Sequence, residues 1–542
     1  MVTYIKENRE NLKNIIKWIC FGMLLIIASM TVFALSMEHL QNGTSVTQRI
    51  YDYNCTLCVL SIVLHITYVL INFIGKKSEE ITKSIKQFFK KEWPCLLLVI
   101  FMVWTSVGCI RAGMEAEAEK KISDAYQALQ DGKEIDIDAV EDAMKIAEWS
   151  SGNRATNAAD RSWNGCNNLK DGYFSFLFYA TVVVDVILLG NNSEKMKKWI
   201  LRVMMLAMTI IAFLTFFNLK NTAFMAGDMP YKRAIFHNSN HYGYYLSIGV
   251  ILCATMFMKE KNWYFKGLAL IGYVVSLYMA IMNNTFGAYL GILFSIVALT
   301  IYSFVYGISN ILSASEENTV KGKLELLKVM IITGVFVFFS VTICAVGEEK
   351  PIVAKNFETT LRDVGIWVDV AKSESEESKD NTEIKIEENS TSEAIANTGS
   401  GRGEVWVGVF HLIKQKPIFG WGLENLLQAF YDQLDINEGR THNLILQLMG
   451  TTGIPGMLLY MVAVIAIFVR CLKRIKTWNS LEYITMFCFI SYMVSSMFGN
   501  SAFYTSPYFM IILGILITAN WNEKIAIGDG NKDVKKWKEF KR

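Results

Sequence analysis

Long apolar stretches, separated by short polar ones, run along most of the chain. A helix rises about 1.5 Å per residue, so roughly 20 apolar residues cross the hydrocarbon core of a bilayer. Stretches of this kind lie at 15–37, 53–75, 93–112, 173–190, 199–218, 239–258, 265–283, 286–306, 327–346, 443–469, 481–498 and 507–521. The pattern therefore predicts an all-α polytopic membrane protein with about 12 transmembrane helices.

The composition agrees with a chain that is solvated by lipid. Of the 542 residues, 52% are hydrophobic and 19% are charged, whereas a soluble protein usually has about 25% charged residues. The net charge of +3 is too small to indicate a nucleic-acid partner. The first apolar stretch exceeds the hydrophobic region of a signal peptide, about 7–15 residues, so we expect it to be a retained helix.

Positive charges mark one side of the predicted bundle. Lysines and arginines gather in short loops and in the C-terminal tail, at 76–91, 195–198, 259–266, 470–476 and 524–542. With 12 spans, all of these segments fall on the side of the N-terminus. Because short cytoplasmic loops are enriched in lysine and arginine, we expect both termini in the cytoplasm.

Two long polar segments are predicted on the extracytoplasmic side. The first, 113–172, has apolar residues at helical spacing, which predicts a helical cap. The second, 347–442, is a large loop that contains an acidic, aromatic-free stretch at 372–393, typical of a disordered linker. The remaining parts are transmembrane helices 1–3 in residues 1–112, helices 4–9 in 173–346, helices 10–12 in 443–521 and a basic cytoplasmic tail at 522–542.

The large loop also carries two amphipathic stretches, at 402–434, separated by Pro417, Gly420 and Gly422. The apolar positions are Val405, Trp406, Val409, Phe410 and Ile413 in the first, and Leu423, Leu426, Leu427, Phe430 and Leu434 in the second. We expect the first helix to lie at the membrane surface.

Motifs of phosphate-binding loops (GxxxxGK[ST]), zinc peptidases (HExxH) and acyl hydrolases (GxSxG) do not occur in the sequence. Candidate chemistry is instead found in three polar clusters. The first, ahead of the sixth span, contains Arg233, His237, Asn238, Asn240 and His241. An interfacial belt with helix-capping asparagines is an alternative explanation. A metal-binding histidine pair is another, but no carboxylate follows nearby.

The second cluster is GSGRGEVW, in which Arg402 and Trp406 lie four residues apart and share one face of a helix. Arg402 could pair with the acidic linker, but a guanidinium is also the forked donor that suits a diphosphate. The third cluster joins Arg440, His442 and Asn443 at the start of the tenth span. An isolated interfacial histidine is usually inert, yet all three clusters fall on the same predicted outer face.

At these residues the chain resembles the O-antigen ligase and O-antigen polymerase superfamily, integral membrane glycosyltransferases that use glycans linked to undecaprenyl diphosphate. The resemblance covers about residues 199–500 and rests on an arginine-led polar cluster, on R-x-x-x-W followed by P-x-x-G-x-G, and on H-N followed by G-x-x-G. The residues that carry it are Arg233 through Asn240, Arg402, Trp406, Pro417, Gly420, Gly422, His442, Asn443, Gly453 and Gly456. The chain departs from the family pattern at Thr451, where an acidic residue is frequent, and at Thr285 and Phe286, in place of Ser-Arg.

The resemblance implies a reaction, a donor and roles for individual residues. A glycan would pass from undecaprenyl diphosphate to a hydroxyl of a glycan or lipid acceptor, on the outer face of the bacterial cytoplasmic membrane, without a metal or another cofactor. Arg233 and Arg402 would bind the diphosphate leaving group, and His442 would deprotonate the acceptor. Residues expected to shape the sugar pocket are Asn238, Asn240, His241, Trp406 and Asn443.

Two other classes of protein remain as alternatives. A transporter or flippase for lipid-linked glycans would place polar residues near the bilayer midplane and show inverted repeats, whereas the polar clusters here lie at the edges of spans. A non-catalytic membrane scaffold is the third hypothesis. Neither the glycan nor the choice between polymerase and ligase follows from the residues.

Overall fold

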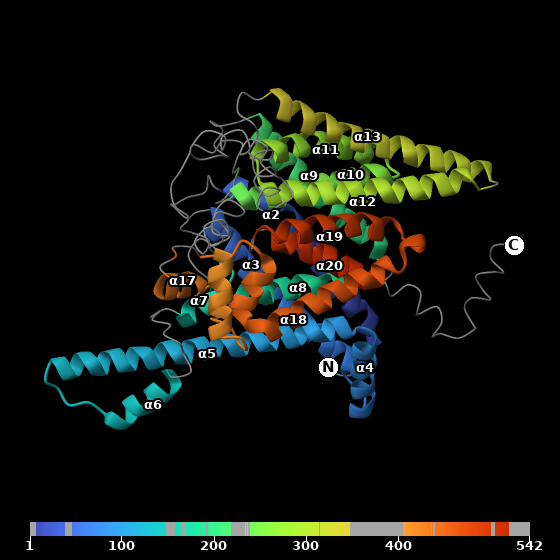
Figure 1. Cartoon of the computed structure of the whole chain (residues 1–542). Coiled ribbons are helices and arrows are strands. Elements are labelled where there is room, and N and C mark those ends of the chain that lie inside the picture. The colour runs from blue at the N-terminus through green and yellow to red at the C-terminus, as the bar shows by residue number, and fades with distance from the viewer. Residues whose placement is uncertain are drawn as a thin grey trace, which may run out of the picture.

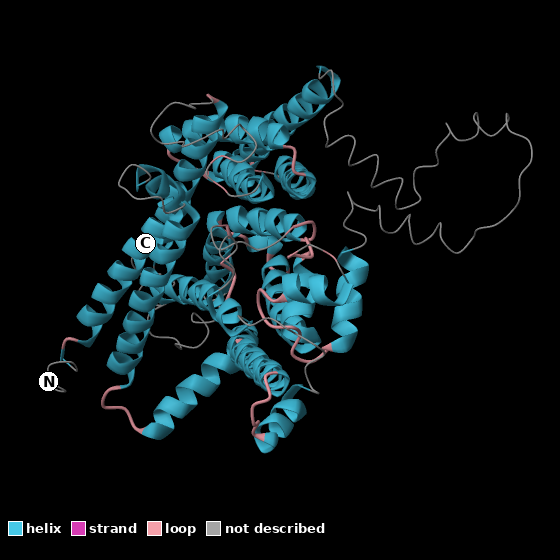
Figure 2. Cartoon of the chain, turned by 90° about the vertical axis from the view of Figure 1, so that its left-hand side faces the viewer, coloured by secondary structure: helices cyan, strands magenta, loops and turns pink. Residues whose placement is uncertain are grey.

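The computed structural model describes residues 7–37, 46–147, 158–164, 170–190, 193–217, 234, 236, 239–313, 315–346, 405–434, 436, 439–499 and 505–519. Arg233, Asn238 and Arg402, the acidic linker 372–393 and the basic tail 522–542 lie outside these residues. Within them, the chain forms helices and no strand, as Figure 2 shows. The all-α prediction is therefore confirmed for the described part of the chain.

Each of the 12 predicted apolar stretches is a helix in the structure. They are α2 (Arg9–Met37), α3 (Val46–Phe73), α5 (Trp93–Gln130), α8 (Tyr173–Leu189), α9 (Glu194–Phe216), α10 (Ser239–Lys259), α11 (Trp263–Asn283), α12 (Phe286–Ile311), α13 (Glu316–Val346), α18 (Leu444–Leu472), α19 (Ser480–Ser496) and α20 (Ser506–Ala519). Nine of these described helices are long and apolar enough to cross a membrane. The other three, α8, α19 and α20, have only 17, 17 and 14 residues, so 12 crossings stay a prediction.

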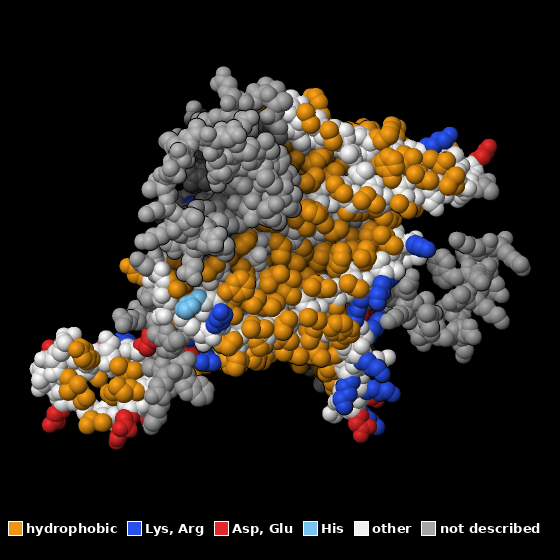
Figure 3. Space-filling model, viewed as in Figure 1, with side chains coloured by type: hydrophobic (Ala, Val, Ile, Leu, Met, Phe, Trp, Pro, Cys, Tyr) orange, Lys and Arg blue, Asp and Glu red, His pale blue; other side chains and the backbone are white. Residues whose placement is uncertain are grey.

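The helices lie mostly side by side and form one bundle with a broad hydrophobic belt (Figures 1 and 3). α10 lies in its interior, because every residue from His241 to Met258 is buried. α18 and α5 pack against each other along the bundle (Figure 1). α18 begins beside the short helices at one end of the bundle and ends beside α4 (Ser78–Lys91) at the other.

α5 continues well beyond its apolar half. We expected the third span to end near residue 112, but the helix runs unbroken for 38 residues, to Gln130. The sequence after 112 is rich in alanine, glutamate and lysine, which favour helix whether or not lipid surrounds them. The extension packs against α6 (Ile137–Ala147) as a projecting hairpin, and α7 (Ala158–Asn164) returns the chain to the bundle (Figure 1).

Candidate functional site

Helix α18 is interrupted near its start by a glycine and a proline. Gly453 has φ 75° and ψ 173°, outside the helical range, and Pro455 follows inside the same helix. Because proline has no N–H, Pro455 leaves the carbonyl of Thr451 without its helical donor. The kink thus exposes backbone groups that another segment must satisfy.

The loop 416–425 supplies the missing partners from the side. Its backbone and that of the kink exchange three hydrogen bonds. Trp421 N donates to Gly450 O at 2.8 Å, Gly422 N donates to Thr451 O at 3.0 Å, and Ile454 N donates to Pro417 O at 2.8 Å. The P-x-x-G-x-G segment and the G-x-x-G segment, more than 30 residues apart in the sequence, therefore form one interlocked unit.

Glycine is required where these two backbones touch. Gly453 and Gly420 both have positive φ, 75° and 66°. A Cβ added to Gly420 would lie 2.6 Å from the carbonyl oxygen of Gly450, and one added to Gly453 would collide with the carbonyl of Ile418. Any side chain at either position would force the segments apart.

A buried ion pair anchors the loop to α5. The ammonium of Lys416 contacts Glu115 Oε2 at 2.8 Å and lies 4.2 Å from the centre of the Trp421 ring. Glu115 also accepts from Arg111 Nε at 2.7 Å. Burial lowers the pKa of Lys416, although Glu115 opposes this effect. The interlocked unit is thus fixed to the long helix as well as to α18.

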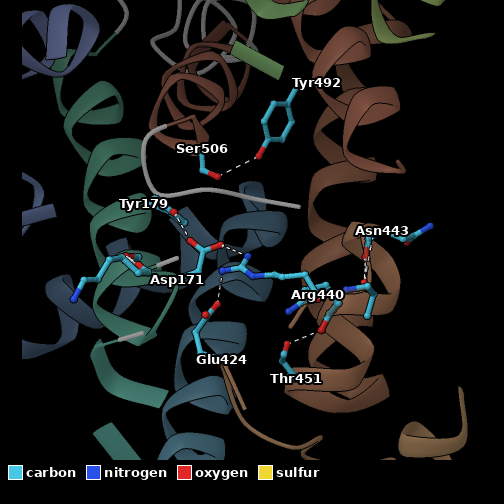
Figure 4. A network of polar contacts seen from close by, with 12 residues as sticks. Asp171, Tyr179, Glu424, Arg440, Asn443, Thr451, Tyr492 and Ser506 are labelled. Carbon is cyan, nitrogen blue, oxygen red and sulfur yellow. Dashed lines mark hydrogen bonds and ion pairs between the residues drawn. The ribbon is translucent and has the colours of Figure 1, made fainter. Parts of the chain in front are cut away.

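Arg440 holds the turn that leads into α18. Its guanidinium is buried, contacts Asp171 Oδ2 at 3.0 Å and also pairs with Glu424 (Figure 4). The hydroxyl of Tyr179 donates to the other oxygen of Asp171 at 2.8 Å. Burial alone would lower the pKa of Arg440, but Glu424 and Asp171 together raise it. An arginine enclosed by two carboxylates has a structural role here, because breaking such a pair leaves an uncompensated buried charge.

His442 lies between this anchored turn and the first residue of α18. Its φ is 52°, a left-handed value that is uncommon outside glycine and indicates backbone strain. Asn443 is the N-cap, since its Oδ1 accepts from Ile445 N and Leu446 N at 2.9 and 3.1 Å. The partly exposed His442 side chain is therefore presented from a backbone that is fixed on both sides.

Trp406 ties a short surface helix to the same turn. Residues 405–415 are helical, and the indole N–H of Trp406 donates to Thr441 O at 2.8 Å. The buried side of this helix packs against α17 (Leu426–Leu434) and the start of α18, through Val405, Val409, Leu412, Ile413, Trp421, Leu426, Phe430 and Leu446. Phe410, expected on that apolar side, is instead 49% exposed.

The predicted cluster at the start of α10 lies at the same end of the bundle. The carbonyl of Ser239 accepts from Asn283 Nδ2 at 3.0 Å and from Thr285 Oγ1 at 3.3 Å. His241 is buried in the first turn of the helix, while Asn240 is partly exposed. Thr285, where the family pattern has serine, thus fixes the end of α10 to the turn between α11 and α12.

The end of α19 joins the two predicted clusters. Asn443 Nδ2 donates to Met497 O at 3.1 Å, and Tyr244 Oη donates to Phe498 O at 2.9 Å. α10 and the N-cap of α18 are thus linked through the residues just after α19, because the carbonyl of Phe498 accepts from Tyr244 and that of Met497 accepts from Asn443.

The structure brings five of the predicted site residues to one end of the bundle, and these are Asn240, His241, Trp406, His442 and Asn443. The other three lie outside the described residues. Sequence reasoning missed the groups that hold the turn, Asp171 and Glu424, and the backbone bridge at Met497. Asp171 and Glu424 could have been sought from the sequence, because Arg440 lies beside the start of a span and a buried arginine needs anionic partners.

A metal site requires a set of donor side chains that lie close together. No group of three histidine, cysteine, aspartate or glutamate side chains lies close enough to hold a metal ion there. His237, one half of the alternative metal-binding pair, lies outside the described residues.

Comparison with known proteins adds one finding. Residues 238–461 match the family model described as O-antigen ligase. This match confirms the resemblance that the sequence motifs predicted, over the segment that holds α10, the interlocked unit and His442. No curated protein matches the chain.

Proposed function

We propose, from the O-antigen ligase match over residues 238–461, that the protein is a membrane glycosyltransferase of surface polysaccharide biosynthesis. It transfers a glycan from undecaprenyl diphosphate to a hydroxyl of a glycan or lipid acceptor. The reaction takes place on the outer face of the bacterial cytoplasmic membrane. The observation that supports the proposal is that the described motif residues, among them Asn240, Trp406 and Asn443, lie at one end of the bundle with His442.

His442 acts as the general base. Histidine is a common general base, and its imidazole can take the proton of the acceptor hydroxyl while the oxygen attacks the sugar and the bond to the diphosphate breaks. The fixed turn supports this role, because catalysis requires a base that is already positioned. Asn443 caps α18 and donates to the carbonyl of Met497, just after α19, so its observed contacts favour positioning His442 over holding a sugar.

Arg233 and Arg402 bind the diphosphate. Negative charge grows on the leaving diphosphate during transfer, and fixed guanidinium groups stabilise it. Arg440 is unsuited to this task because Asp171 and Glu424 already surround it. Arg402 precedes Trp406 by four residues in the sequence, and Trp406 is bonded to the turn of His442, which supports a place for Arg402 near the base.

The lipid part of the donor has a candidate binding place within the bundle, between α4 at the opposite end and Tyr179, which contacts the polar network near this site. An almost wholly apolar cavity of about 430 Å³ lies among α3, α4, α5, α8, α18 and α20. Tyr179 lines it and also donates to Asp171, the partner of Arg440. A polyisoprenoid chain in this cavity would keep its diphosphate near the polar network.

A reconstituted transfer assay tests the proposed function. The purified protein in lipid nanodiscs, given an undecaprenyl-diphosphate glycan and an acceptor, should form product without a nucleotide sugar and in excess chelator. Activity that disappears with chelator and returns with one divalent ion would contradict the arginine-based mechanism. Movement of the labelled donor between leaflets of a vesicle without any transfer would favour a flippase.

The predicted topology has its own test. In intact cells, an impermeant thiol reagent should label a cysteine at position 380, in the acidic linker, and spare one at 530, in the basic tail. Permeabilised cells serve as the control, because both positions should then react. Labelling of 530 alone in intact cells would place the candidate site in the cytoplasm and contradict the proposed donor chemistry.

A further inference from the structure

Helix α4 lies apart from the helices that cross the bundle. It has 14 residues, none of them buried, and it follows α3 after a short turn. In Figure 1, α4 runs across the direction of α5 at the end of the bundle opposite to the beginning of α18. Isolated helices of this length are marginal in water, so α4 needs a surface against which to pack.

An ion pair with a buried carboxylate sets the direction of α4. Glu92, the residue between α4 and α5, is 3% exposed and accepts from Arg470 Nη1 at 2.8 Å. The same guanidinium donates to Lys91 O at 3.0 Å. Because Arg470 lies near the end of α18, the junction is fixed to a long apolar helix, and α4 leaves the bundle at a defined angle.

The two faces of α4 differ sharply in character. Ile81, Ile85, Phe88 and Phe89 share one face by helical spacing, and Ile85 is 43% exposed. The opposite face carries Lys83, Lys86 and Lys90. Six lysines and only two glutamates lie between residues 76 and 91, and Figure 3 shows this gathering of positive charge beside the hydrophobic belt.

We propose that α4 lies flat on the bilayer and binds anionic phospholipids, with its apolar face among the acyl chains and its lysines among the headgroups. The charge complements an anionic lipid surface. The orientation across α5 and the exposed Trp93 at the junction, 42% exposed, agree with a position at the lipid headgroups. Since Phe88 and Phe89 also line the apolar cavity, bound lipid would fix one of its walls.

Amide hydrogen exchange of the full-length protein tests this inference. We would compare residues 78–91 in nanodiscs of phosphatidylcholine alone and in nanodiscs that also contain phosphatidylglycerol. Exchange should slow by about tenfold or more in the anionic discs, and the difference should shrink in high salt. The Lys83→Gln/Lys86→Gln/Lys90→Gln variant should lose most of the difference.

The matched control replaces two lysines at the other end of α5. Lys120→Gln/Lys121→Gln removes charge from the projecting hairpin, so it should leave the lipid dependence of residues 78–91 unchanged. Equal exchange in both kinds of disc, or a lipid effect that survives the triple substitution, would overturn the proposal. Fast exchange that slows only when a cytosolic protein is added would also overturn it, in favour of a protein partner.

Discussion

Replacing His442 by alanine is expected to abolish glycan transfer while the protein still inserts into the membrane and accumulates. Loss of a general base typically lowers the rate by about 10²–10⁴-fold. The readout in cells is lipid-linked glycan that accumulates unused, and in nanodiscs it is the initial rate of transfer. Arg233→Ala and Arg402→Ala should have effects of similar size, because each removes charge that acts mainly in the transition state.

His442→Asn separates the loss of the proposed base from any effect on the left-handed backbone at this position. Asparagine tolerates the left-handed conformation that His442 adopts at φ 52°, yet it cannot take a proton. This variant should therefore be as inactive as the alanine variant but at least as stable. Near-normal transfer by His442→Asn would show that His442 is not the base.

Arg402→Lys tests whether Arg402 binds the diphosphate through two parallel hydrogen bonds or only through its positive charge. The lysine ammonium keeps the charge but lacks the forked pair of donors. A severe loss of transfer rate would therefore favour bidentate hydrogen bonding. Lys414→Ala is the control, because Lys414 is exposed on the same short helix as Trp406 and should leave the rate near that of the wild type. If all three alanine variants at 233, 402 and 442 transfer glycan normally, the site is misassigned.

The second large effect is expected from Gly453→Ala. A methyl group would collide with the carbonyl of Ile418, and alanine disfavours the φ of 75°. Strain and overpacking together should cost about 3 kcal/mol or more. Thermal unfolding in detergent measures the loss, and transfer activity should fall with it because the kink orients the start of α18.

Gly267→Ala provides the comparison for this variant. Outside its chain neighbours and its own helix backbone, no described atom lies within 4 Å of a Cβ at Gly267, and its backbone is helical within α11. The substitution should therefore be neutral or slightly stabilising. Gly420→Ala, on the other side of the interlock, should resemble Gly453→Ala, and unchanged stability of both would contradict the proposed requirement for glycine.

The sequence predicted the helices well because apolar length is a local property. Every expected stretch is a helix, and α5 departs from expectation only because its polar continuation also favours helix. Whether α8, α19 and α20 cross a membrane depends on their neighbours, since 17 or 14 residues are short for a bilayer of about 30 Å. Local pattern cannot decide that question.

The candidate site was predictable only in part, because long-range contacts define it. The motifs identified His442 and Trp406, but not that the Trp406 indole bonds to the turn of His442. Asn443 was assigned to a sugar, although asparagine before an apolar run is also a common N-cap signal. Asp171 is 269 residues and Glu424 is 16 residues from Arg440 in the sequence, and only the fold brings both carboxylates to it.

The interlock between the loop and α18 has a consequence for the order in which the protein matures. The ribosome synthesises Pro417 to Gly422 before α18. This loop therefore stays undocked until α18 has been synthesised and has folded. Until the loop and α18 dock, the carbonyls of Gly450 and Thr451 lack their partners, and the turn that carries His442 is not fixed. Completion of the candidate site would then be a late event in biogenesis, and slow amide exchange at Trp421 and Gly422 would mark the molecules in which it is complete.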